Sequence, residues 1–352
     1  MKFVPEPYQS LAIEHLLDHD RVFLCMGVGL GKSASALSAL RGLFADGAIR
    51  SALIVAPLRV ANLTWPNEVA KWDEFKWMKV ESLRGRVPSG RAHLYTINYE
   101  QLPSLKNLDF CDVVVFDEIT RAKNPASERI KAIRPKLKHH RRWGLTGTPR
   151  PNSLLDLFAQ VRLLDDGKRL GPSFHAFKTA WCHATDYMEY NWVPNPGAED
   201  GIYKRIHDIT LTLRTSDYSD QPDIVVEDVE VKLPDAARSL YHTLEKELLI
   251  SLGPKGDVVA INAAALVNKL LQVTGGTVYN ESRGVIEVHD GKIKALKRVL
   301  AEVDGNALIF TNYIHERERV CKAIDGVDAS RFVGDIEAAW NSRKIKYLVA
   351  DP

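Results

Sequence analysis

The stretch Cys25–Leu37, CMGVGLGKSASAL, joins the end of an apolar run to three glycines and a Lys-Ser pair. A phosphate-binding loop in its strict form reads Gly, any four residues, then Gly-Lys-Ser or Gly-Lys-Thr. Counted back from Gly31, that pattern requires a glycine at Met26, and Gly27 comes one residue late. The strict pattern therefore fails, although the ingredients of a phosphate-binding loop are present.

A phosphate cradle needs backbone N–H groups at a strand-to-helix turn, glycines that let the phosphate approach, and a cation. Gly27, Gly29 and Gly31 supply the permissive backbone. Lys32 supplies charge for the β- and γ-phosphates of a nucleotide, and Ser33 offers a hydroxyl for Mg²⁺. A glycine-rich turn with a solvated lysine is the alternative interpretation of this stretch alone.

The second half of an ATPase site is a carboxylate at the end of an apolar strand, and residues 112–118, DVVVFDE, supply one. We expect Asp117 to hold Mg²⁺ and Glu118 to polarise the attacking water, because phosphoryl transfer depends on positioning and charge neutralisation. Two adjacent acids can also cap a following helix. Their place downstream of Gly-x-Gly-Lys-Ser favours the ATPase interpretation.

The first half of the chain alternates short apolar strands with amphipathic helices. Strands are predicted at 21–26, 51–57, 93–99, 112–118 and within 141–149, and helices at 32–44, 60–72, 126–137 and 152–164. Strands that are apolar on both faces and separated by helices indicate a buried parallel sheet in an α/β fold. Ligands bind at the carboxyl ends of such strands, so the polar residues that follow the strands should converge on one edge.

The 352 residues suggest two domains. We expect an α/β domain over 1–164, an irregular bridging region rich in Gly, Pro, Asp and aromatics over 165–225, and a second α/β domain over 226–352. The second domain opens with a predicted strand at 225–233 and long helices at 235–252 and 262–273. Further helices are predicted at 292–303, 316–324 and 336–345, and further strands at 307–312, 329–334 and 346–352. The thin sheet makes this second domain look incomplete.

The overall charge identifies no partner, because 47 Lys and Arg residues nearly balance 45 Asp and Glu residues. Residues 129–142, RIKAIRPKLKHHRR, carry seven Lys and Arg residues and no acid. This stretch is either a solvated basic face or a local phosphate-binding patch. The four cysteines are far apart, which indicates free thiols in a reducing cytoplasm, and we expect no signal peptide and no membrane span.

Several segments in order resemble the motifs of Swi/Snf-type helicase-like ATPases of superfamily two, and the resemblance spans nearly the whole chain. The matching segments are the glutamine motif at 7–9, motif I at 26–33, Ia at 53–72, Ib at 96–100, II at 114–127, III at 143–164, the opening of the second lobe at 233–248, and IV at 307–313. The resemblance implies two RecA-like lobes with parallel sheets, the second incomplete.

The resemblance also implies roles for individual residues, with ATP and Mg²⁺ as cofactors and duplex DNA, held by its backbone, as partner. Gln9 would read adenine, and Thr146 and Thr148 would link the nucleotide state to the DNA path. The residues expected to touch the nucleic-acid backbone are Pro57, Arg59, Thr96, Asn98 and Thr311.

Two departures from the family pattern limit what the resemblance implies. Ile119 and Thr120 follow the motif II acids where the family usually has Ala-His or Gly-His, which puts in question the contact that couples ATP turnover to motif III. Residues 334–352 resemble the approach to motif V, and the arginines of motif VI are absent from the 352 residues. An arginine finger contributes about three to five orders of magnitude in rate.

We therefore expect an ATP-dependent translocase on duplex DNA whose hydrolysis is impaired in this chain. A truncation, a natural fragment, or a split protein with a partner that supplies the missing function would each explain the absence of motif VI. The alternative is a non-catalytic nucleotide- and DNA-binding module derived from the motor fold. An unrelated P-loop phosphotransferase is the third interpretation, and the ordered motifs disfavour it.

Overall fold

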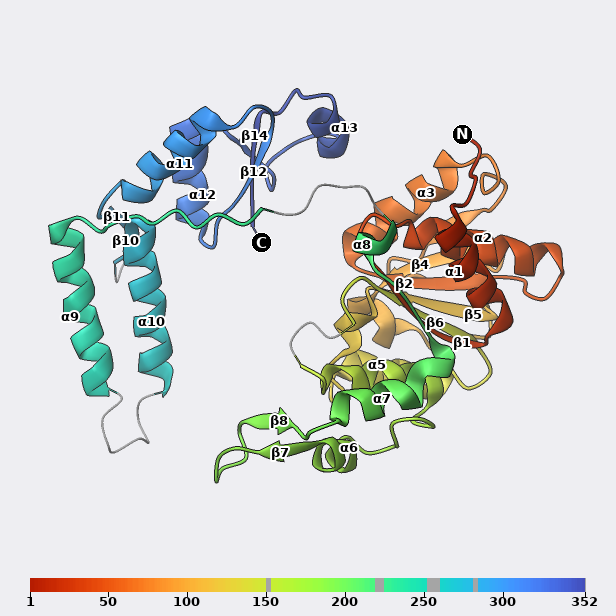
Figure 1. Ribbon diagram of the computed structural model, residues 1–352. Helices are drawn as coiled ribbons and strands as arrows, with labels where there is room; N and C mark the ends of the chain where they lie inside the picture. Colours follow the sequence, from red (N-terminus) through yellow and green to blue (C-terminus); the bar gives the residue numbers. More distant parts are fainter. Residues whose placement is uncertain (150–152, 219–224, 252–259, 281–283, 352) are drawn as a thin grey trace. The chain divides into compact units, whose positions relative to one another are not determined.

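The computed structural model describes residues 1–149, 153–218, 225–251, 260–280 and 284–351. The chain forms two compact units, Met1–Pro222 and Asp223–Pro352, coloured red to green and green to blue in Figure 1. Each unit contains parallel strands connected by helices, as the α/β prediction requires.

A seven-stranded sheet forms the centre of the first unit, and every neighbouring pair in it is parallel. The strand order is β3-β4-β2-β5-β6-β1-β9. The strands are β1 Arg21–Met26, β2 Ala52–Ala56, β3 Val80–Ser82, β4 Leu94–Asn98, β5 Val113–Asp117, β6 Arg141–Thr146 and β9 Thr210–Leu213. The predicted parallel sheet is confirmed, and its carboxyl ends share one edge.

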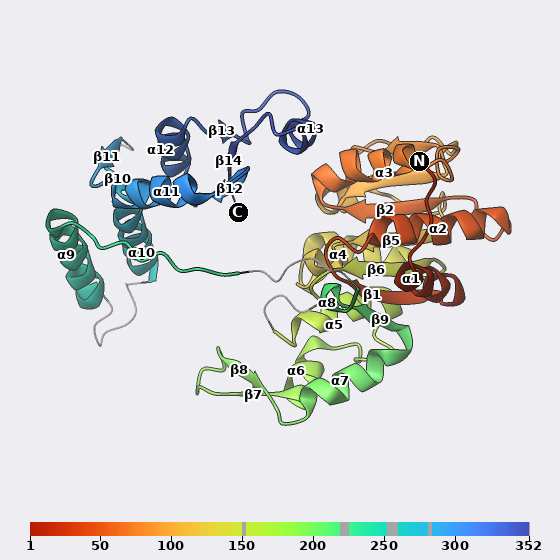
Figure 2. The same cartoon turned by 45° about the horizontal axis from the view of Figure 1, so that its top comes forward.

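Helices cover both faces of this sheet (Figure 2). Alternate side chains of one strand therefore enter two different cores. In β1, Phe23 and Cys25 join one core, whereas Val22, Leu24 and Met26 join the other. The helices α1 Pro7–Asp18, α2 Lys32–Ala45 and α3 Trp65–Lys71 pack on the Val22 side. The helices α4 Glu128–Ile133, α5 Asp156–Asp165, α6 Phe174–Trp181 and α7 Ala198–Ile206 pack on the Phe23 side.

The segment after residue 165 contains more regular structure than its composition indicates. It holds α6, the hairpin of β7 Cys182–Ala184 and β8 Trp192–Pro194, α7, β9 and the short helix α8 Thr215–Tyr218. The strand β9 pairs with β1 and extends the sheet. The prediction of irregular structure followed the composition of the whole segment and so missed β9, although its four residues, TLTL, alternate polar and apolar side chains as a strand does.

The second unit contains a helical pair, a hairpin and a three-stranded parallel sheet of order β12-β14-β13. The helical pair is α9 Asp235–Ser251 and α10 Ala260–Gly275, and the hairpin joins β10 Thr277–Tyr279 to β11 Val285–Glu287. The sheet consists of β12 Ala307–Phe310, β13 Val327–Asp328 and β14 Tyr347–Ala350, with helices α11 Gly291–Glu302, α12 Ile314–Ile324 and α13 Ile336–Asn341.

Two strand predictions in the second unit are wrong. Residues 225–233 form neither strand nor helix, and Val225 and Val226 are 88% and 82% exposed. The strand predicted at 329–334 is replaced by the two-residue β13, which ends before it. Apolar runs form strands only where a neighbouring strand accepts their hydrogen bonds.

Three of the four cysteine side chains, those of Cys25, Cys111 and Cys182, are buried, and none of the four is disulfide-bonded. Burial raises the pKa of the Cys25 thiol to about 12. Across the described residues, every helix is too short or too polar to cross a lipid bilayer.

Candidate active site

The loop between β1 and α2 contains two glycines in the left-handed backbone region. Gly29 and Gly31 adopt φ angles of 83° and 84°, which L-residues with side chains rarely adopt. A Cβ on Gly31 would lie 2.5 Å from Nε2 of Gln9, so close packing also requires glycine there. No side chain caps α2, which begins at Lys32 and continues through Ser33, and its first-turn N–H groups are therefore available to an anion.

Gln9 ties the start of α1 to this loop. Its Nε2 donates to the Leu30 carbonyl at 3.0 Å, and its Oε1 accepts from the Glu6 N–H at 3.0 Å. The side chain is 8% exposed. One N–H and one lone pair of its amide take no part in these two bonds.

Lys32 extends along the loop toward the acids of β5. Its Nζ donates to the carbonyls of Met26 at 2.8 Å and Gly27 at 3.2 Å. Burial lowers the pKa of the Lys32 ammonium, and the charges of Asp117 and Glu118 oppose that shift. The predicted cation and the predicted acid pair are therefore close enough to interact.

Asp117, the last residue of β5, is a buried carboxylate held by two donors. Trp65 of α3 donates its Nε1–H to Oδ2 at 2.8 Å, and the Glu118 N–H donates to Oδ1 at 3.0 Å. Burial raises the pKa of Asp117, while the Trp65 hydrogen bond and the Lys32 charge lower it. Sequence reasoning missed the contact with Trp65, because the spacing between residues 65 and 117 carries no signal.

Glu118 stands in a strained backbone conformation at the centre of a hydroxyl network. Its φ of 51° and ψ of 56° lie in the left-handed region. Thr120 donates to its Oε1 at 2.8 Å, and Thr146 at the end of β6 approaches the same oxygen at 3.4 Å. The Thr148 N–H in turn donates to Thr146 Oγ1 at 3.0 Å. Motifs II and III are thus joined by hydroxyls where the family pattern has a histidine.

The carboxyl end of β9 approaches the same loop and was not predicted to do so. Thr215 donates to the Val28 carbonyl at 3.3 Å, and a Cβ on Gly27 would lie 2.1 Å from Thr215 Oγ1. Beside the loop lies a hollow of about 680 Å³ lined by Gly27, Gly147 and Arg214, among others. Arg214 and Thr215, the polar residues that directly follow TLTL, were the sequence signal that could have predicted this approach.

The four nucleic-acid candidates of the first unit do not share one environment. Pro57 and Arg59 follow the carboxyl end of β2, and Arg59 is exposed. Asn98, 7% exposed, donates to Glu100 Oε2 at 3.0 Å. Thr96 is fully buried within β4 between two neighbouring strands, so the prediction that its side chain contacts DNA disagrees with its position.

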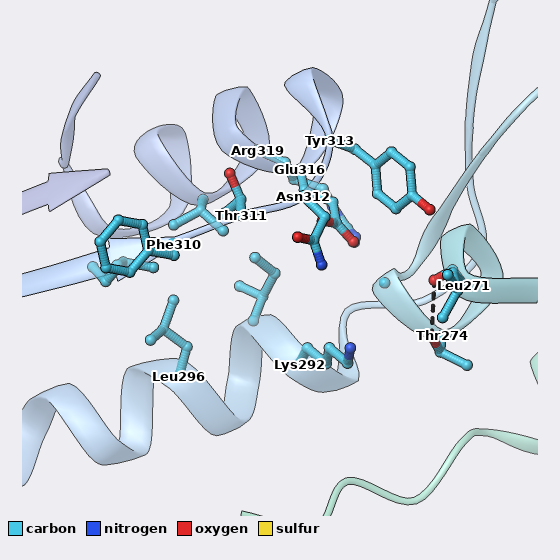
Figure 3. Close-up of a pocket in the computed structure, with 14 residues that line it drawn as sticks. Leu271, Thr274, Lys292, Leu296, Phe310, Thr311, Asn312, Tyr313, Glu316 and Arg319 are labelled. Carbon is cyan, nitrogen blue, oxygen red and sulfur yellow. Dashed lines mark hydrogen bonds between the residues drawn. The ribbon is translucent and has the colours of Figure 1, made fainter. Parts of the chain in front are cut away.

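Thr311 lies in the second unit, where β12 ends, and lines a pocket of about 290 Å³. Figure 3 shows it beside Asn312 and Tyr313, with Lys292 of α11 across the pocket. Thr311 is 9% exposed, and its Oγ1 has no hydrogen-bond partner in the part of the chain that the structure describes. This pocket lies at the carboxyl end of a parallel strand, where α/β folds bind ligands.

The sequence of this chain is similar to those of known proteins. Residues 8–274 match the SNF2-related domain. The chain is 35% identical to putative protein p41 of Acyrthosiphon pisum secondary endosymbiont phage 1, over 99% of this chain and 81% of that protein. It is 27% identical to the DNA repair and recombination protein RAD54 of Oryza sativa subsp. japonica, over 44% of this chain and 18% of that protein.

The fold has a solved counterpart in the SWI2/SNF2 ATPase core of Sulfolobus solfataricus in complex with double-stranded DNA. The TM-score is 0.54 at 19% sequence identity, and the match covers 100% of this chain and 78% of that one. With the family match over most of its length, the chain belongs to the SNF2-related family of Swi/Snf-type, helicase-like ATPases, and its parallel sheets belong to RecA-like lobes.

Proposed function

We propose that this chain is an ATP- and Mg²⁺-dependent translocase on duplex DNA. The observation that carries the proposal is the convergence of Lys32, Asp117 and Glu118 at one edge of the first sheet, next to an uncapped helix start. This set of residues supplies a phosphate cation, a metal ligand and a base within one loop cluster.

Lys32 and the glycine loop are proposed to bind the nucleotide phosphates. The Lys32 ammonium donates to two backbone carbonyls, and phosphate oxygens would replace these acceptors. The N–H groups of the first turn of α2 would donate to the same phosphates. Gln9 would present the remaining donor and acceptor of its amide to adenine.

The residues present fit a magnesium ion held largely by nucleotide and water. Mg²⁺ prefers hard oxygen ligands and usually takes one or two from protein. Asp117 offers a buried carboxylate, and Ser33 offers a hydroxyl in the first turn of α2. The described residues contain no cluster of three or more His, Cys, Asp or Glu side chains that would form an all-protein cage. When bound, the ion would neutralise phosphate charge.

Glu118 is proposed to orient and deprotonate the attacking water. Thr120 holds its Oε1, and Thr146 lies within reach of the same atom. The other carboxylate oxygen, Oε2, would face the water. Movement of Thr146 and Thr148 with the DNA path would then change the position of the base.

Duplex DNA is the proposed partner, bound through its backbone by Pro57, Arg59, Asn98 and Thr311. The DNA repair and recombination name of one relative and the DNA complex of the structural counterpart support this partner. The phage source of p41 supports action in the cytoplasm of a bacterial host.

The test is ATP hydrolysis by the purified chain with and without a duplex of about four helical turns, followed by displacement of a triplex-forming strand. We expect duplex DNA to raise hydrolysis, and Lys32→Ala and Glu118→Gln to abolish it. Arg91→Gln, at an exposed position outside every motif, is the control. Because the arginines of motif VI are absent from the 352 residues, hydrolysis is also measured in a chain extended to include that motif. Nucleotide and DNA binding by the extended chain without stimulated hydrolysis would reject the translocase and favour the non-catalytic module.

A further inference from the structure

A basic hollow lies on the first unit outside the candidate active site. Lys131, Arg134 and Lys138 line it together with Pro135 and Asp166, and its volume is about 560 Å³. The three cations are spaced three and four residues apart along α4, the 3₁₀ turn that follows it and the residues just beyond. This spacing places side chains on one side of a helical segment.

The positive charge of this hollow is poorly compensated. Nε atoms of both Arg134 and Arg162 are buried and lack a hydrogen-bond partner among the described residues. Burial lowers the pKa of Arg162, the neighbouring Arg134 charge lowers it further, and the Asp166 charge raises it. Lys131 pairs with Glu128 at 3.1 Å, but both side chains are exposed, and such pairs contribute little.

The acid that lines the hollow is already engaged elsewhere. Asp166 accepts from Arg142 at 2.7 Å, and the Arg142 side chain is fully buried. Arg142 also donates to the carbonyls of Leu137 at 3.0 Å and Leu163 at 3.1 Å. These bonds tie Leu137, Leu163 and Asp166, the acid that lines the hollow, to one buried side chain.

The hollow lies at the edge of the sheet opposite the nucleotide loop. The strand β6 begins at Arg141, three residues after Lys138, and ends at Thr146 beside Glu118. Because the strands are parallel, the amino end of β6 and the carboxyl end of β1 are at opposite edges. The basic stretch therefore cannot share a ligand atom with Lys32.

We propose that this hollow binds consecutive phosphates of a nucleic-acid backbone, as a second DNA contact separate from Arg59 and Asn98. The inference rests on the proposed DNA partner. Lys131 lies in α4, Arg134 in the 3₁₀ turn after it and Lys138 beyond both, so the hollow offers three separate cations to more than one phosphate. Cations without an accompanying base-reading side chain bind the backbone and carry no sequence preference.

The experiment measures binding of two fluorescent duplexes of unrelated sequence by anisotropy between about 50 and 200 mM salt, without nucleotide. The test variant combines Lys131→Gln, Arg134→Gln and Lys138→Gln. The matched control combines Lys2→Gln, Arg91→Gln and Lys204→Gln, which removes the same charge from exposed positions on other elements. Thermal unfolding verifies that both variants fold. If the triple test variant does not fold, the single variant Lys138→Gln, at an exposed site, replaces it.

We expect the test variant to bind both duplexes about tenfold or more weakly, with the slope of log K against log salt less negative by about 2 to 3. Each phosphate that the protein no longer neutralises makes that slope less negative by roughly 0.9, so Lys138→Gln alone should change it by about that amount. The control should change affinity less than about twofold, because its positions lie outside the hollow.

Equal affinities and slopes for the test and control variants would overturn the inference, as would the absence of DNA binding by the unchanged chain. Arg59→Gln separates this inference from the proposed function. If Arg59→Gln weakens binding and the test variant does not, the second contact fails while the translocase stands. If the test variant weakens binding but DNA never stimulates hydrolysis, the second contact stands without the translocase.

Discussion

Thr120 occupies the position where the family pattern has the motif II histidine, and its hydroxyl donates to Glu118 Oε1 at 2.8 Å. Replacing it with valine removes the hydroxyl and keeps the branched shape of the side chain. The Glu118 backbone, at φ 51°, lies outside the usual region, so its carboxylate depends on side-chain contacts for its position. Thr146 at 3.4 Å is the weaker of the two hydroxyl contacts.

The magnitude follows from the kind of hydrogen bond that the valine variant lacks. A hydrogen bond to a charged group contributes about 1.5 kcal/mol or more. If that energy holds Glu118 in its reactive position, its removal lowers kcat about tenfold. Thr120 bonds Glu118, the proposed base, and not the proposed phosphate loop, so the KM for ATP should stay within about twofold.

The assay is DNA-stimulated ATP hydrolysis at saturating duplex, with kcat and KM measured for Thr120→Val, Thr120→Ser and Thr146→Val. Serine keeps the hydroxyl and should restore most of kcat. Thr146→Val should reduce kcat less than Thr120→Val because its contact is longer. The affinity for a fluorescent nucleotide is measured as well, because displacement of Glu118 alone should leave that affinity unchanged.

Two results would refute this reasoning. A kcat for Thr120→Val within about twofold of the unchanged chain would show that the hydroxyl does not position the base. Equal reductions in the serine and valine variants would show that the effect comes from packing. A rise in KM with constant kcat would instead place Thr120 in nucleotide binding.

Three further predictions concern stability. Burial raises the pKa of Asp117 above 3.8, so the stability that Asp117 contributes is full below pH 3.8 and declines as the pH rises through its folded-state pKa. In urea unfolding between about pH 4 and 7, the free energy of unfolding of the unchanged chain should therefore fall relative to that of Asp117→Asn. A difference between the two that does not depend on pH would contradict this. Gly31→Ala should lower the free energy of unfolding more than Gly47→Ala, because both φ angles are positive but only Gly31 abuts Gln9. Gly47→Ala should cost about 1 kcal/mol, and equal melting temperatures for the two variants would refute the close contact at Gly31. Arg142→Met removes a donor from the Leu137 and Leu163 carbonyls and from the half-exposed Asp166 carboxylate, and the Leu137 carbonyl keeps the His140 N–H as a donor. The variant should therefore cost about 2 to 3 kcal/mol in urea unfolding, whereas a cost below about 1 kcal/mol would disprove the anchoring role of Arg142.

Periodicity and motif order predicted the first sheet well because its strands are apolar on both faces. β1, β2, β4, β5 and β6 are fully or almost fully buried runs, and such runs have few alternatives to a central parallel strand. The loop before Lys32 and the acids after β5 follow directly from that topology, since carboxyl ends of parallel strands meet. The prediction from sequence missed the strand β9 and wrongly placed a strand at 225–233. These two segments differ in that β9 has a neighbouring strand, β1, to pair with.

The amino-acid sequence was sufficient to predict the parallel α/β architecture, the family resemblance, and which edge of the sheet gathers Gly31, Lys32, Asp117 and Glu118. These follow from local patterns of burial and from glycine and carboxylate chemistry, which act over a few residues. Three features emerged from the folded chain instead. Trp65 donates a hydrogen bond to Asp117, Thr120 donates one to Glu118, and Lys131, Arg134 and Lys138 line one hollow. They depend on how segments and side chains pack in three dimensions, and no spacing along the sequence encodes those distances.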